Sequence, residues 1–331
     1  AYATEKGDVY FSVDSYHSYG KLSRRNLEDA KNGVRVDNDE LKKNPLDFAL
    51  WKSAKEGEPY WNSPWGKGRP GWHIECSTMN RKTFGDQIDI HGGGRDLIFP
   101  HHENEIAQTE SLTGKRFAKY WIHNGLIKVN GQKMSKSLGN SLLLKDLLDK
   151  YSKETIKFAL LSTNYRGDIN ITDNLFPDAE EHLANFYKVF VLAEEKGIKI
   201  SGDYVAIDKE FDECMDDDFN TALAISNLYA YFKKAKSLIL KGDEDGGKML
   251  SQIKKTYSLL GLFTEKPQEF LATIESKQEK IPSEITALAE ERLIARKNKD
   301  YATSDALRNE ISLKGYEIKD VKDGYILTKT R

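Results

Sequence analysis

A twenty-residue stretch, Asp89 to Gln108, combines residues that could bind a nucleotide and a metal ion. Its glycines, Gly92 to Gly94, allow the backbone to approach a ligand closely or to adopt positive φ. The carboxylate of Asp96 follows, where it could hold a pair of hydroxyl groups. On the helix expected next, His101 and Glu105 stand four residues apart and point toward one spot, where they are plausible zinc ligands.

A zinc site needs a third ligand, and Cys76 is the best candidate because thiolate, imidazole and carboxylate together suit zinc. The alternative is structural. A buried cysteine usually acts as a small hydrophobic residue, and a His/Glu pair at this spacing is often a solvated helix face. His102-Glu103 begins like the HExxH metalloprotease motif, but Ile106 occupies the position of the second histidine, which excludes that class.

A second cluster is the pentapeptide KMSKS, Lys133 to Ser137, which follows the strong turn signal Asn130-Gly131. A loop with two lysines and two hydroxyl groups suits a polyphosphate whose charge grows during a displacement. The alternative, an exposed basic turn, does not explain the order of these residues. The glycines at 92–94 match neither standard glycine-rich nucleotide motif, so a plain turn is their alternative.

The elements that would position these residues form an α/β unit. His73 to Phe84 is predicted as a helix closed by Gly85, Gln87 to Ile90 as a strand running into a glycine turn, and Pro100 as the first turn of the next helix. Ligands in such sheets bind beyond the carboxyl ends of the strands, here His91 to Asp96.

Other segments are less distinctive. Tyr120 to Ile122 and Leu126 to Val129 are predicted as a strand pair, and Leu46 to Trp51 as a helix that Gly57 ends. The stretch 59–72, rich in proline, glycine and tryptophan, is predicted to be irregular: either the wall of a substrate site or aromatic packing under a loop.

From Leu142 onward the pattern is helical and indicates a bundle. Helices are predicted over 142–150, 154–162, 180–195, 218–241 and 248–262, then a helical hairpin over 284–299 and 301–313, and a β-hairpin over 316–321 and 325–329.

Composition indicates a globular chain of two or three domains: 331 residues, 39% hydrophobic and 31% charged. The sequence has no apolar run near the roughly 18 residues needed to span a bilayer and no signal segment, so we expect no membrane partner and a cytoplasmic location.

Its two cysteines, Cys76 and Cys214, do not make a disulfide framework. The net charge of -2 gives no global attraction to nucleic acid but allows local basic stripes. The start at Ala1, without methionine, is typical of the interior of a longer chain.

Three segments in this order resemble the cysteinyl-tRNA synthetase family: GWHIECSTM (Gly71–Met79), the Asp89–Gln108 stretch, and KMSKSLGN (Lys133–Asn140). KMSKS is the second signature of class I aminoacyl-tRNA synthetases. CMDDDFNT (Cys214–Thr221) and ERLIARKNKDYATSDALR (Glu291–Arg308) are similar to the helical tRNA-binding and C-terminal regions of that family.

The resemblance implies an α/β plus α fold of three parts. The first is the second half of a class I synthetase Rossmann-type catalytic domain, with a connective insertion. A helical-bundle tRNA-binding domain and a small α+β C-terminal unit follow. The expected boundaries are 1–70 for the insertion and substrate-wall loop, 71–140 for the catalytic half with KMSKS, 141–175 for a stem-contact region, 176–265 for the bundle, and 266–331 for the anticodon-side unit.

The implied activity is ATP-dependent ligation of cysteine to tRNA(Cys) through a cysteinyl-adenylate. Zinc held by Cys76, His101 and Glu105 would bind the substrate thiol, which separates cysteine from serine better than an apolar pocket could. Trp72 and His91 match positions that line the cysteine pocket.

The resemblance also implies sites for the other two substrates, ATP with Mg²⁺ and tRNA. We expect the enzyme to be a monomer. Gly92, Gly93 and Asp96 match the adenosine and ribose side, and the phosphates would meet the catalytic Lys133 and Lys136, together with Ser135. Arg292, Arg296, Lys297 and Lys299 are candidates for tRNA phosphate contacts, the alternative being that they only solvate a surface helix.

The sequence departs from the family pattern in one respect. Neither the HIGH signature nor a further zinc-binding cysteine occurs before Lys133, so we expect these 331 residues alone to be inactive and three ligands to hold zinc weakly. Two alternatives follow: a non-catalytic tRNA-binding fragment, or a cysteine-activating ligase of the mycothiol type, against which the long C-terminal extension argues.

Overall fold

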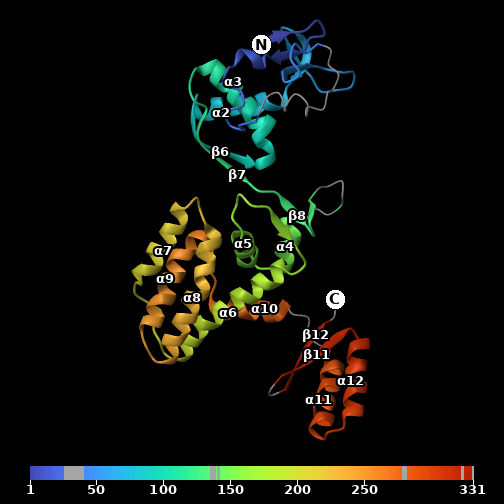
Figure 1. Cartoon of the computed structure of the whole chain (residues 1–331), viewed down its shortest axis with the longest axis vertical. Helices are drawn as coiled ribbons and strands as arrows, with labels where there is room; N and C mark the ends of the chain where they lie inside the picture. Colours follow the sequence, from blue (N-terminus) through green and yellow to red (C-terminus); the bar gives the residue numbers. More distant parts are fainter. Residues whose placement is uncertain (26–40, 135–138, 140–141, 278–281, 322–323, 330–331) are drawn as a thin grey trace. The chain divides into compact units, whose positions relative to one another are not determined.

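A computed structural model describes residues 1–25, 41–134, 139, 142–277, 282–321 and 324–329. The chain divides into two compact units, one of Ala1–Leu183 with Leu192–Thr264, the other of Ala184–Val191 with Glu265–Arg331. Figure 1 shows strands mainly in the first part of the chain and helices after it. None of the described helices is both long enough and apolar enough to cross a membrane.

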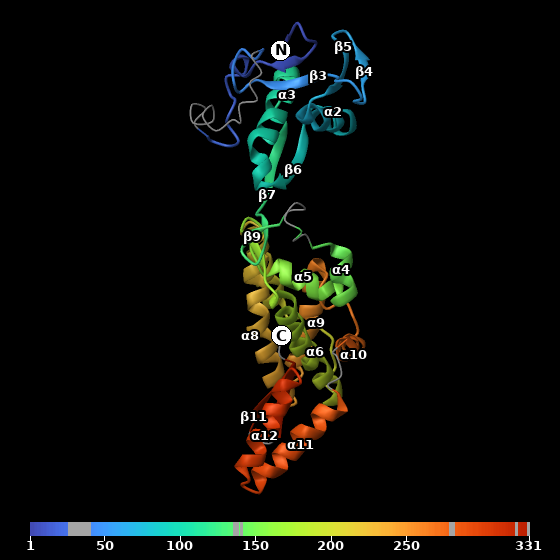
Figure 2. The same ribbon diagram turned by 90° about the vertical axis from the view of Figure 1, so that its right-hand side faces the viewer.

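The first unit opens with a five-stranded antiparallel sheet (Figure 2). Its strands, in spatial order, are β1 (Tyr2–Ala3), β2 (Val9–Phe11), β3 (Phe48–Ser53), β5 (Gly66–Pro70) and β4 (Trp61–Ser63). One core cluster packs against it, made of Phe11, Val13, Tyr19, Leu46, Phe48 and Ala107.

The helix predicted over Leu46 to Trp51 is wrong, because this segment contains most of β3. Both edges of β3 are hydrogen-bonded, to β2 and to β5. Phe48 also stacks on Phe11 with ring centroids 4.9 Å apart, so pairing with distant strands overrides the local helical pattern. Gly57, at φ 83°, lies in a turn and ends no helix.

The stretch 59–72 is also more regular than predicted, since β4 and β5 form a hairpin within it. Gly66 adopts φ 104° at the turn, a conformation that only glycine takes without strain. Large parts of the side chains of Trp61, Trp65 and Trp72 are exposed, so these three rings do not pack under a loop.

The part of the fold that carries the predicted site is a pair of parallel strands, β6 (Ile88–Gly94) and β7 (Ala118–Asn124), with helices α2 (Trp72–Phe84) and α3 (Glu103–Thr113). The predicted helix closed by Gly85 is confirmed as α2. Figure 1 shows both helices close to this strand pair.

The predicted glycine turn is wrong, because Gly92, Gly93 and Gly94 belong to β6 and none has positive φ. Glycine is required here because neighbouring atoms of the chain approach the backbone closely. A Cβ on Gly92 would lie 2.9 Å from the carbonyl oxygen of Ile122, and one on Gly93 would lie 2.9 Å from the ring of His102.

The predicted pairing of 120–122 with 126–129 is also wrong. Among the described strands β7 pairs only with β6, whereas β8 (Ile127–Val129) pairs with β10 (Ile169–Ile171) and with β9 (Gln132–Lys133). The turn signal Asn130-Gly131 is confirmed: both residues have positive φ, 48° and 80°, and they join β8 to β9.

The chain leaves β7 through a tight backbone crossing. A Cβ on Gly125 would lie 1.9 Å from the carbonyl oxygen of Gly167, so only glycine fits there. Next to it, the Asp168 carboxylate accepts a 2.9 Å hydrogen bond from the amide of Leu126 and pairs with Lys128 at 3.0 Å and with Arg95 at 2.8 Å. The hairpin that ends in Lys133 is thus tied to the segment just after β6.

The described helices that follow in this unit are α4 (Leu144–Lys150), α5 (Lys153–Leu161), α6 (Leu175–Glu195, shared with the second unit), α7 (Val205–Asp216), α8 (Thr221–Leu240) and α9 (Asp245–Tyr257). The helix predicted from residue 218 starts later, because Asp218 and Phe219 both have positive φ and Asn220 caps α8. α7 was not predicted.

The second unit contains α10 (Pro267–Lys277), α11 (Ser283–Lys297), α12 (Tyr301–Leu313), β11 (Tyr316–Val321) and β12 (Gly324–Lys329). The predicted helical hairpin and β-hairpin are confirmed, whereas α10 was not predicted. Their core consists of Ile285, Ala289, Ile311, Tyr316 and Ile318.

Candidate functional site

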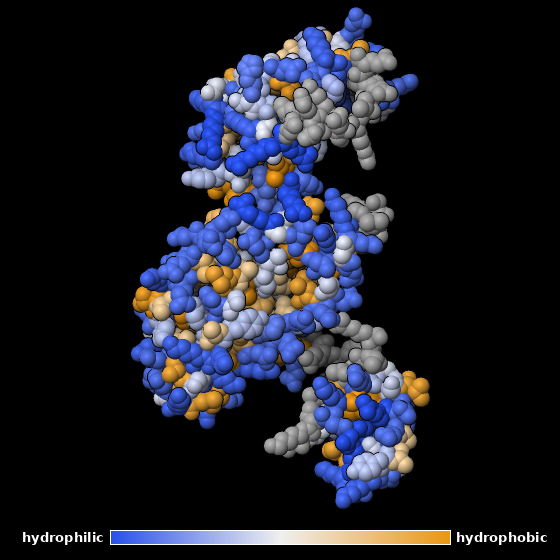
Figure 3. Space-filling model, in the orientation of Figure 1, coloured by the Kyte–Doolittle hydropathy of each residue, from blue (hydrophilic) through white to orange (hydrophobic). Residues whose placement is uncertain are grey.

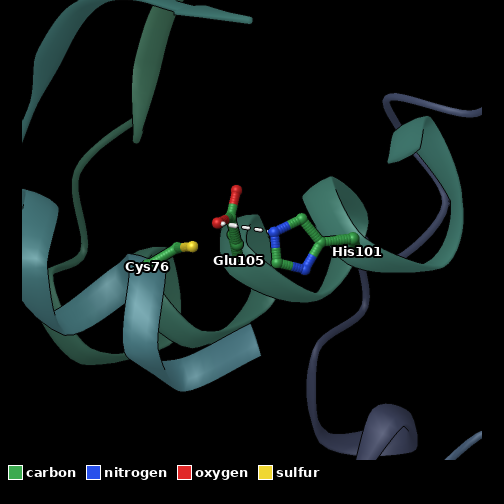
Figure 4. A group of neighbouring side chains, drawn as sticks. All are labelled: Cys76, His101 and Glu105. Atoms are coloured by element: carbon green, nitrogen blue, oxygen red, sulfur yellow. Dashed lines mark ion pairs between the residues drawn. The ribbon is translucent and has the colours of Figure 1, made fainter. Parts of the chain in front are cut away.

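The three predicted zinc ligands come together in the structure (Figure 4). α2 carries Cys76, a short helical turn before α3 carries His101, and α3 carries Glu105. One ligand atom from each lies within 4.8 Å of the others. His101 Nε2 is 3.2 Å from Glu105 Oε1, which is the four-residue contact that the sequence predicted.

Glu105 is fully buried, and its two oxygens have different surroundings. Oε2 lies 2.7 Å from His91 Nε2, at hydrogen-bond distance. Oε1 accepts no well-formed hydrogen bond from the described residues. A buried carboxylate oxygen left in this way is costly. The orphaned oxygen, facing a thiol and an imidazole, fits a site for a cation.

The Cys76 thiol would have to lose its proton to bind a metal ion. Burial and the neighbouring carboxylate of Glu105 raise the pKa of Cys76 to about 11. The thiol is therefore protonated at neutral pH when no cation is present. A divalent cation reverses this preference because it binds the thiolate directly.

His101 is held through its other ring nitrogen. Nδ1 of His101 lies 2.8 Å from Nδ1 of His73. Burial lowers the pKa of His101, and burial together with His101 lowers the pKa of His73 to about 4, so both rings are neutral at pH 7. If His101 donates its Nδ1 proton to His73, its Nε2 lone pair is free, an arrangement common among metal-binding histidines. Trp72 stacks on the His101 ring at 4.6 Å.

A second group of three, His91, His102 and Glu105, also has ligand atoms within 4.8 Å. His102 Nδ1 lies 2.8 Å from His123 Nε2, and burial together with the neighbouring His91 lowers the pKa of His102 to about 3. This group shares Glu105 with the first but lacks a thiol, so the first group suits zinc better. The sequence prediction did not include His73, His102 or His123, whose pairings join residues far apart in the chain.

The residues predicted to face ATP are partly brought together. Asp96 lies in the turn after β6, and its Oδ2 is 3.9 Å from Lys133 Nζ. Gly92 and Gly93 lead into that turn from β6. Ser135 and Lys136 lie outside the described residues.

The four candidates for tRNA phosphate contacts separate into two kinds. Arg292 is 1% exposed and donates hydrogen bonds to both oxygens of Asp320, at 2.7 and 3.1 Å. The prediction that Arg292 contacts a tRNA phosphate at the surface is therefore wrong. Arg296 pairs with the same carboxylate. Lys297 and Lys299 are exposed.

A cavity of about 730 Å³ lies between α2, α3 and the first sheet. Its lining includes Phe11, Leu50, Ile74, Ser77, Gln108 and Leu112. Cys76, His101 and Glu105 do not line it. We therefore place the candidate chemistry at the buried cluster and not in this cavity.

Two family models and several curated proteins match this chain. Residues 1–181 match a family model described as the tRNA synthetases class I (C) catalytic domain, and residues 210–264 match a DALR domain. A cysteine–tRNA ligase of Oleidesulfovibrio alaskensis is 44% identical over 98% of this chain and 72% of its own length. The enzymes of the same name from Geobacter metallireducens and Geobacter sulfurreducens are 42% and 44% identical, each over 98% of this chain and 71% of theirs.

Among solved structures, Mycobacterium tuberculosis methionyl-tRNA synthetase in complex with methionyl-adenylate is 13% identical, with a TM-score of 0.47 over 68% of this chain and 54% of that one. The relatives of the preceding paragraph and the matched catalytic-domain model decide the assignment: the chain belongs to the cysteine–tRNA ligase family of class I aminoacyl-tRNA synthetases.

Proposed function

We propose that this chain serves the ATP-dependent ligation of cysteine to tRNA(Cys) through a cysteinyl-adenylate, with zinc selecting the substrate thiol. The observation that carries the proposal is the buried group of Cys76, His101 and Glu105, in which one carboxylate oxygen of Glu105 lacks a hydrogen bond from the described residues. Zinc bound there would supply a Lewis-acidic position for the substrate thiolate.

The chain's own residues would prepare this site. His73 holds the Nδ1 side of His101 and so directs Nε2 toward Glu105. His91 holds the second oxygen of Glu105 and fixes the orientation of the carboxylate. Trp72, which stacks on His101 and is 57% exposed, would form a wall of the cysteine pocket.

ATP, accompanied by Mg²⁺, would bind beyond β6. The nucleotide would lie beside the glycines at the end of β6, and the Asp96 carboxylate would hold the ribose hydroxyls. Lys133, 3.9 Å from Asp96, would neutralise phosphate charge together with Lys136 as the substrate carboxylate attacks the α-phosphorus. Ser135 would contribute a hydroxyl to the same phosphates.

Zinc content tests the metal site. We expect the purified chain to contain zinc, Cys76→Ala to lose most of it, and Cys214→Ala to keep it, since Cys214 is a buried cysteine of α7 outside the cluster. Equal zinc in the two variants would contradict the proposed ligand set. Zinc retained by three protein ligands would also be removed readily by a chelator.

We further propose that these 331 residues, taken alone, do not form the adenylate, because they contain no HIGH signature and no cysteine before Cys76. Cysteine-dependent exchange of pyrophosphate into ATP is therefore expected to be absent. Measurable exchange, from a preparation whose intact mass matches these residues, would refute this. A monomeric state and a cytoplasmic location stay predictions.

A non-catalytic role in binding tRNA remains as a second candidate, favoured by the DALR match over residues 210–264. Exposed Lys297 and Lys299 would then contact phosphates, and Lys297→Glu with Lys299→Glu should weaken salt-dependent tRNA binding. Unchanged binding would exclude these two contacts. The cysteine-activating ligase of the mycothiol type gains no support, because the matching relatives cited above are cysteine–tRNA ligases.

A further inference from the structure

A single carboxylate, that of Asp168, joins the two segments that carry the proposed ATP-binding residues. Arg95 Nη2 lies 2.8 Å from Oδ1 and 2.9 Å from Oδ2 of Asp168. Lys128 Nζ lies 3.0 Å from Oδ2, and the amide of Leu126 donates a 2.9 Å hydrogen bond to Oδ1. Arg95 belongs to the turn after β6, whereas the other two contacts come from the start of the β8–β9 hairpin. We call Asp168 with these three contacts the Asp168 clamp.

Each arm of the clamp ends one step from a residue that the proposed function uses. Asp96, the candidate for the ribose hydroxyls, follows Arg95 directly in the same helical turn. Lys133, the candidate for phosphate charge, is the partner of Lys128 in the register of β8 with β9. Side chains opposite each other on an antiparallel pair lie about 5 Å apart at Cβ. A shift of either arm would therefore change the 3.9 Å separation between Asp96 Oδ2 and Lys133 Nζ.

The clamp also compensates a pair of like charges. Two lysines directly opposite each other destabilise a hairpin unless anions lie beside them. Asp168 pairs with Lys128, and Asp96 lies beside Lys133. Hydrogen bonds from the Leu126 amide and from Lys128 lower the pKa of Asp168, so this carboxylate is charged at neutral pH. Loss of that charge would leave the repulsion between the two lysines uncompensated at Lys128.

The backbone around Asp168 is held on both sides, so its side chain can act as an anchor. The amide of Gly125 donates a 2.7 Å hydrogen bond to the carbonyl of Tyr165. The amide of Ile169 donates one of 3.0 Å to the carbonyl of Leu126. The carboxylate therefore starts from a fixed point beside the strand that it binds.

The clamp lies close to solvent. Figure 3 shows hydrophilic residues on the surface where the chain passes from β7 to β8. The side chains of Asp96 and Lys133 are exposed, so a ligand in solution can reach both of them.

We propose that Asp168 is a positioning residue for ATP, because its clamp sets the distance between Asp96 and Lys133. Its effect passes through the turn and the hairpin that it joins. Misplacing a binding group by about 1 Å can lower a reaction rate roughly 100-fold, so a fixed distance here matters for catalysis. That the two positioned residues receive ATP rests on the proposed function, whereas the positioning itself does not.

Zero-length cross-linking of the full chain tests the positioning. A carbodiimide joins a carboxylate to an amine that lies next to it, so it should link Asp96 to Lys133, with a yield measured by peptide mass spectrometry. Asp89 and Lys119, 2.7 Å apart on β6 and β7, give a reference yield in the same sample. In Asp168→Ala the ratio of the first yield to the reference should fall at least about threefold, since two ion pairs of one carboxylate are lost.

Asp86→Ala is the matched control. Asp86 also binds one arginine and one lysine, Arg81 and Lys115, each at 3.0 Å. The yield ratio of this variant should equal that of the parent. Asp168→Glu, which keeps the charge, should recover most of the ratio that Asp168→Ala loses, a rescue that a general weakening of the fold would not show.

A second variant decides the matter if Asp168→Ala does not fold. The Arg95 side chain is 47% exposed, so Arg95→Gln should fold, and it removes the arm that reaches the turn after β6. Its yield ratio should fall as in Asp168→Ala. Lys128→Gln should have a smaller effect, because the Leu126 amide still holds the hairpin to Asp168.

Three results would overturn the proposal: no link between Asp96 and Lys133 in the parent, a parent-like ratio in Arg95→Gln, or an equal fall in Asp86→Ala. A separate measurement addresses ATP itself. Acetylation of Lys133 by an N-hydroxysuccinimide ester should slow when ATP with Mg²⁺ is added to the parent, and should slow less in Asp168→Ala. Unchanged acetylation in the parent would refute the proposed ATP site, while the cross-linking result alone would still decide the positioning by Asp168.

Discussion

The ion pair of Arg292 gives a prediction about the stability of the second unit. Replacing Asp320 by asparagine leaves a buried guanidinium without its carboxylate partner. Breaking a fully buried pair in this way costs about 3–5 kcal/mol. The Asp320 side chain is 36% exposed, so water can replace part of the lost interaction, and we expect a loss of about 2 kcal/mol.

Hydrogen exchange measured on peptides of α11 is a suitable assay, because the chain has no tryptophan beyond Trp121 to report on this unit. A loss of about 2 kcal/mol corresponds to roughly 30-fold faster exchange of the best-protected amides. Arg296→Gln is the matched control. It removes a more exposed partner of the same carboxylate, so exchange should accelerate about fivefold at most.

The same pair sets a pH dependence. Hydrogen bonding from Arg292 lowers the pKa of Asp320 below that of an unfolded aspartate. The stabilisation is therefore complete above the unfolded pKa, near 3.9, and is lost as the pH falls through the lower folded value. The amide exchange rates of the parent and of Asp320→Asn should therefore become equal at acidic pH. Exchange in Asp320→Asn within threefold of the parent at pH 7, or a larger effect of Arg296→Gln, would refute the assignment of Arg292 as a buried, paired charge.

Two further changes have defined outcomes. In Gly125→Ala the new Cβ would meet the carbonyl of Gly167 at 1.9 Å, so unfolding followed by tryptophan fluorescence should show a loss of about 3 kcal/mol or more. The matched control Gly167→Ala should lose clearly less, because its nearest contact would be the carbonyl of Asn164 at 3.2 Å. Burial lowers the pKa of His73 to about 4, so between pH 6.5 and 4 the unfolded state binds more protons than the folded state. The unfolding free energy of the metal-free chain should therefore fall as the pH drops through this range. His73→Asn should reduce that fall, while the exposed His17→Asn should not; equal pH profiles for all three chains would contradict the burial of His73.

Local signals predicted the elements whose structure is locally determined. α2 ends at a glycine with positive φ, and the Asn130-Gly131 turn needs positive φ at both residues, so neighbouring residues suffice to identify them. The hairpin of α11 and α12 was found by its helical periodicity in the same way.

Errors arose where a distant partner decides the structure. β3 has a helical pattern but is paired on both edges, and the strand at 127–129 pairs with residue 169 and its neighbours, not with the strand before it. Arg292 looked like a surface cation because its sequence neighbours are charged, yet Asp320, 28 residues away, holds it inside.

The candidate site was predictable only in part. Residue types and the family resemblance indicated Cys76, His101 and Glu105, whose atoms do lie together. The pairings of His73 with His101 and of His102 with His123 could not be predicted, because they depend on how α2, α3 and β7 pack.

The crossing at Gly125 and Gly167 has a consequence for how this chain tolerates insertions and deletions. The spacing between Asp96 and Lys133 is set there, where two backbones touch and Asp168 holds Arg95 and Lys128. One residue added between β7 and β8 would either displace the contacts of that crossing or shift the β8–β9 hairpin, and Lys133 with it, relative to Asp96. The segment that joins β7 to β8 therefore has little tolerance for a change of length.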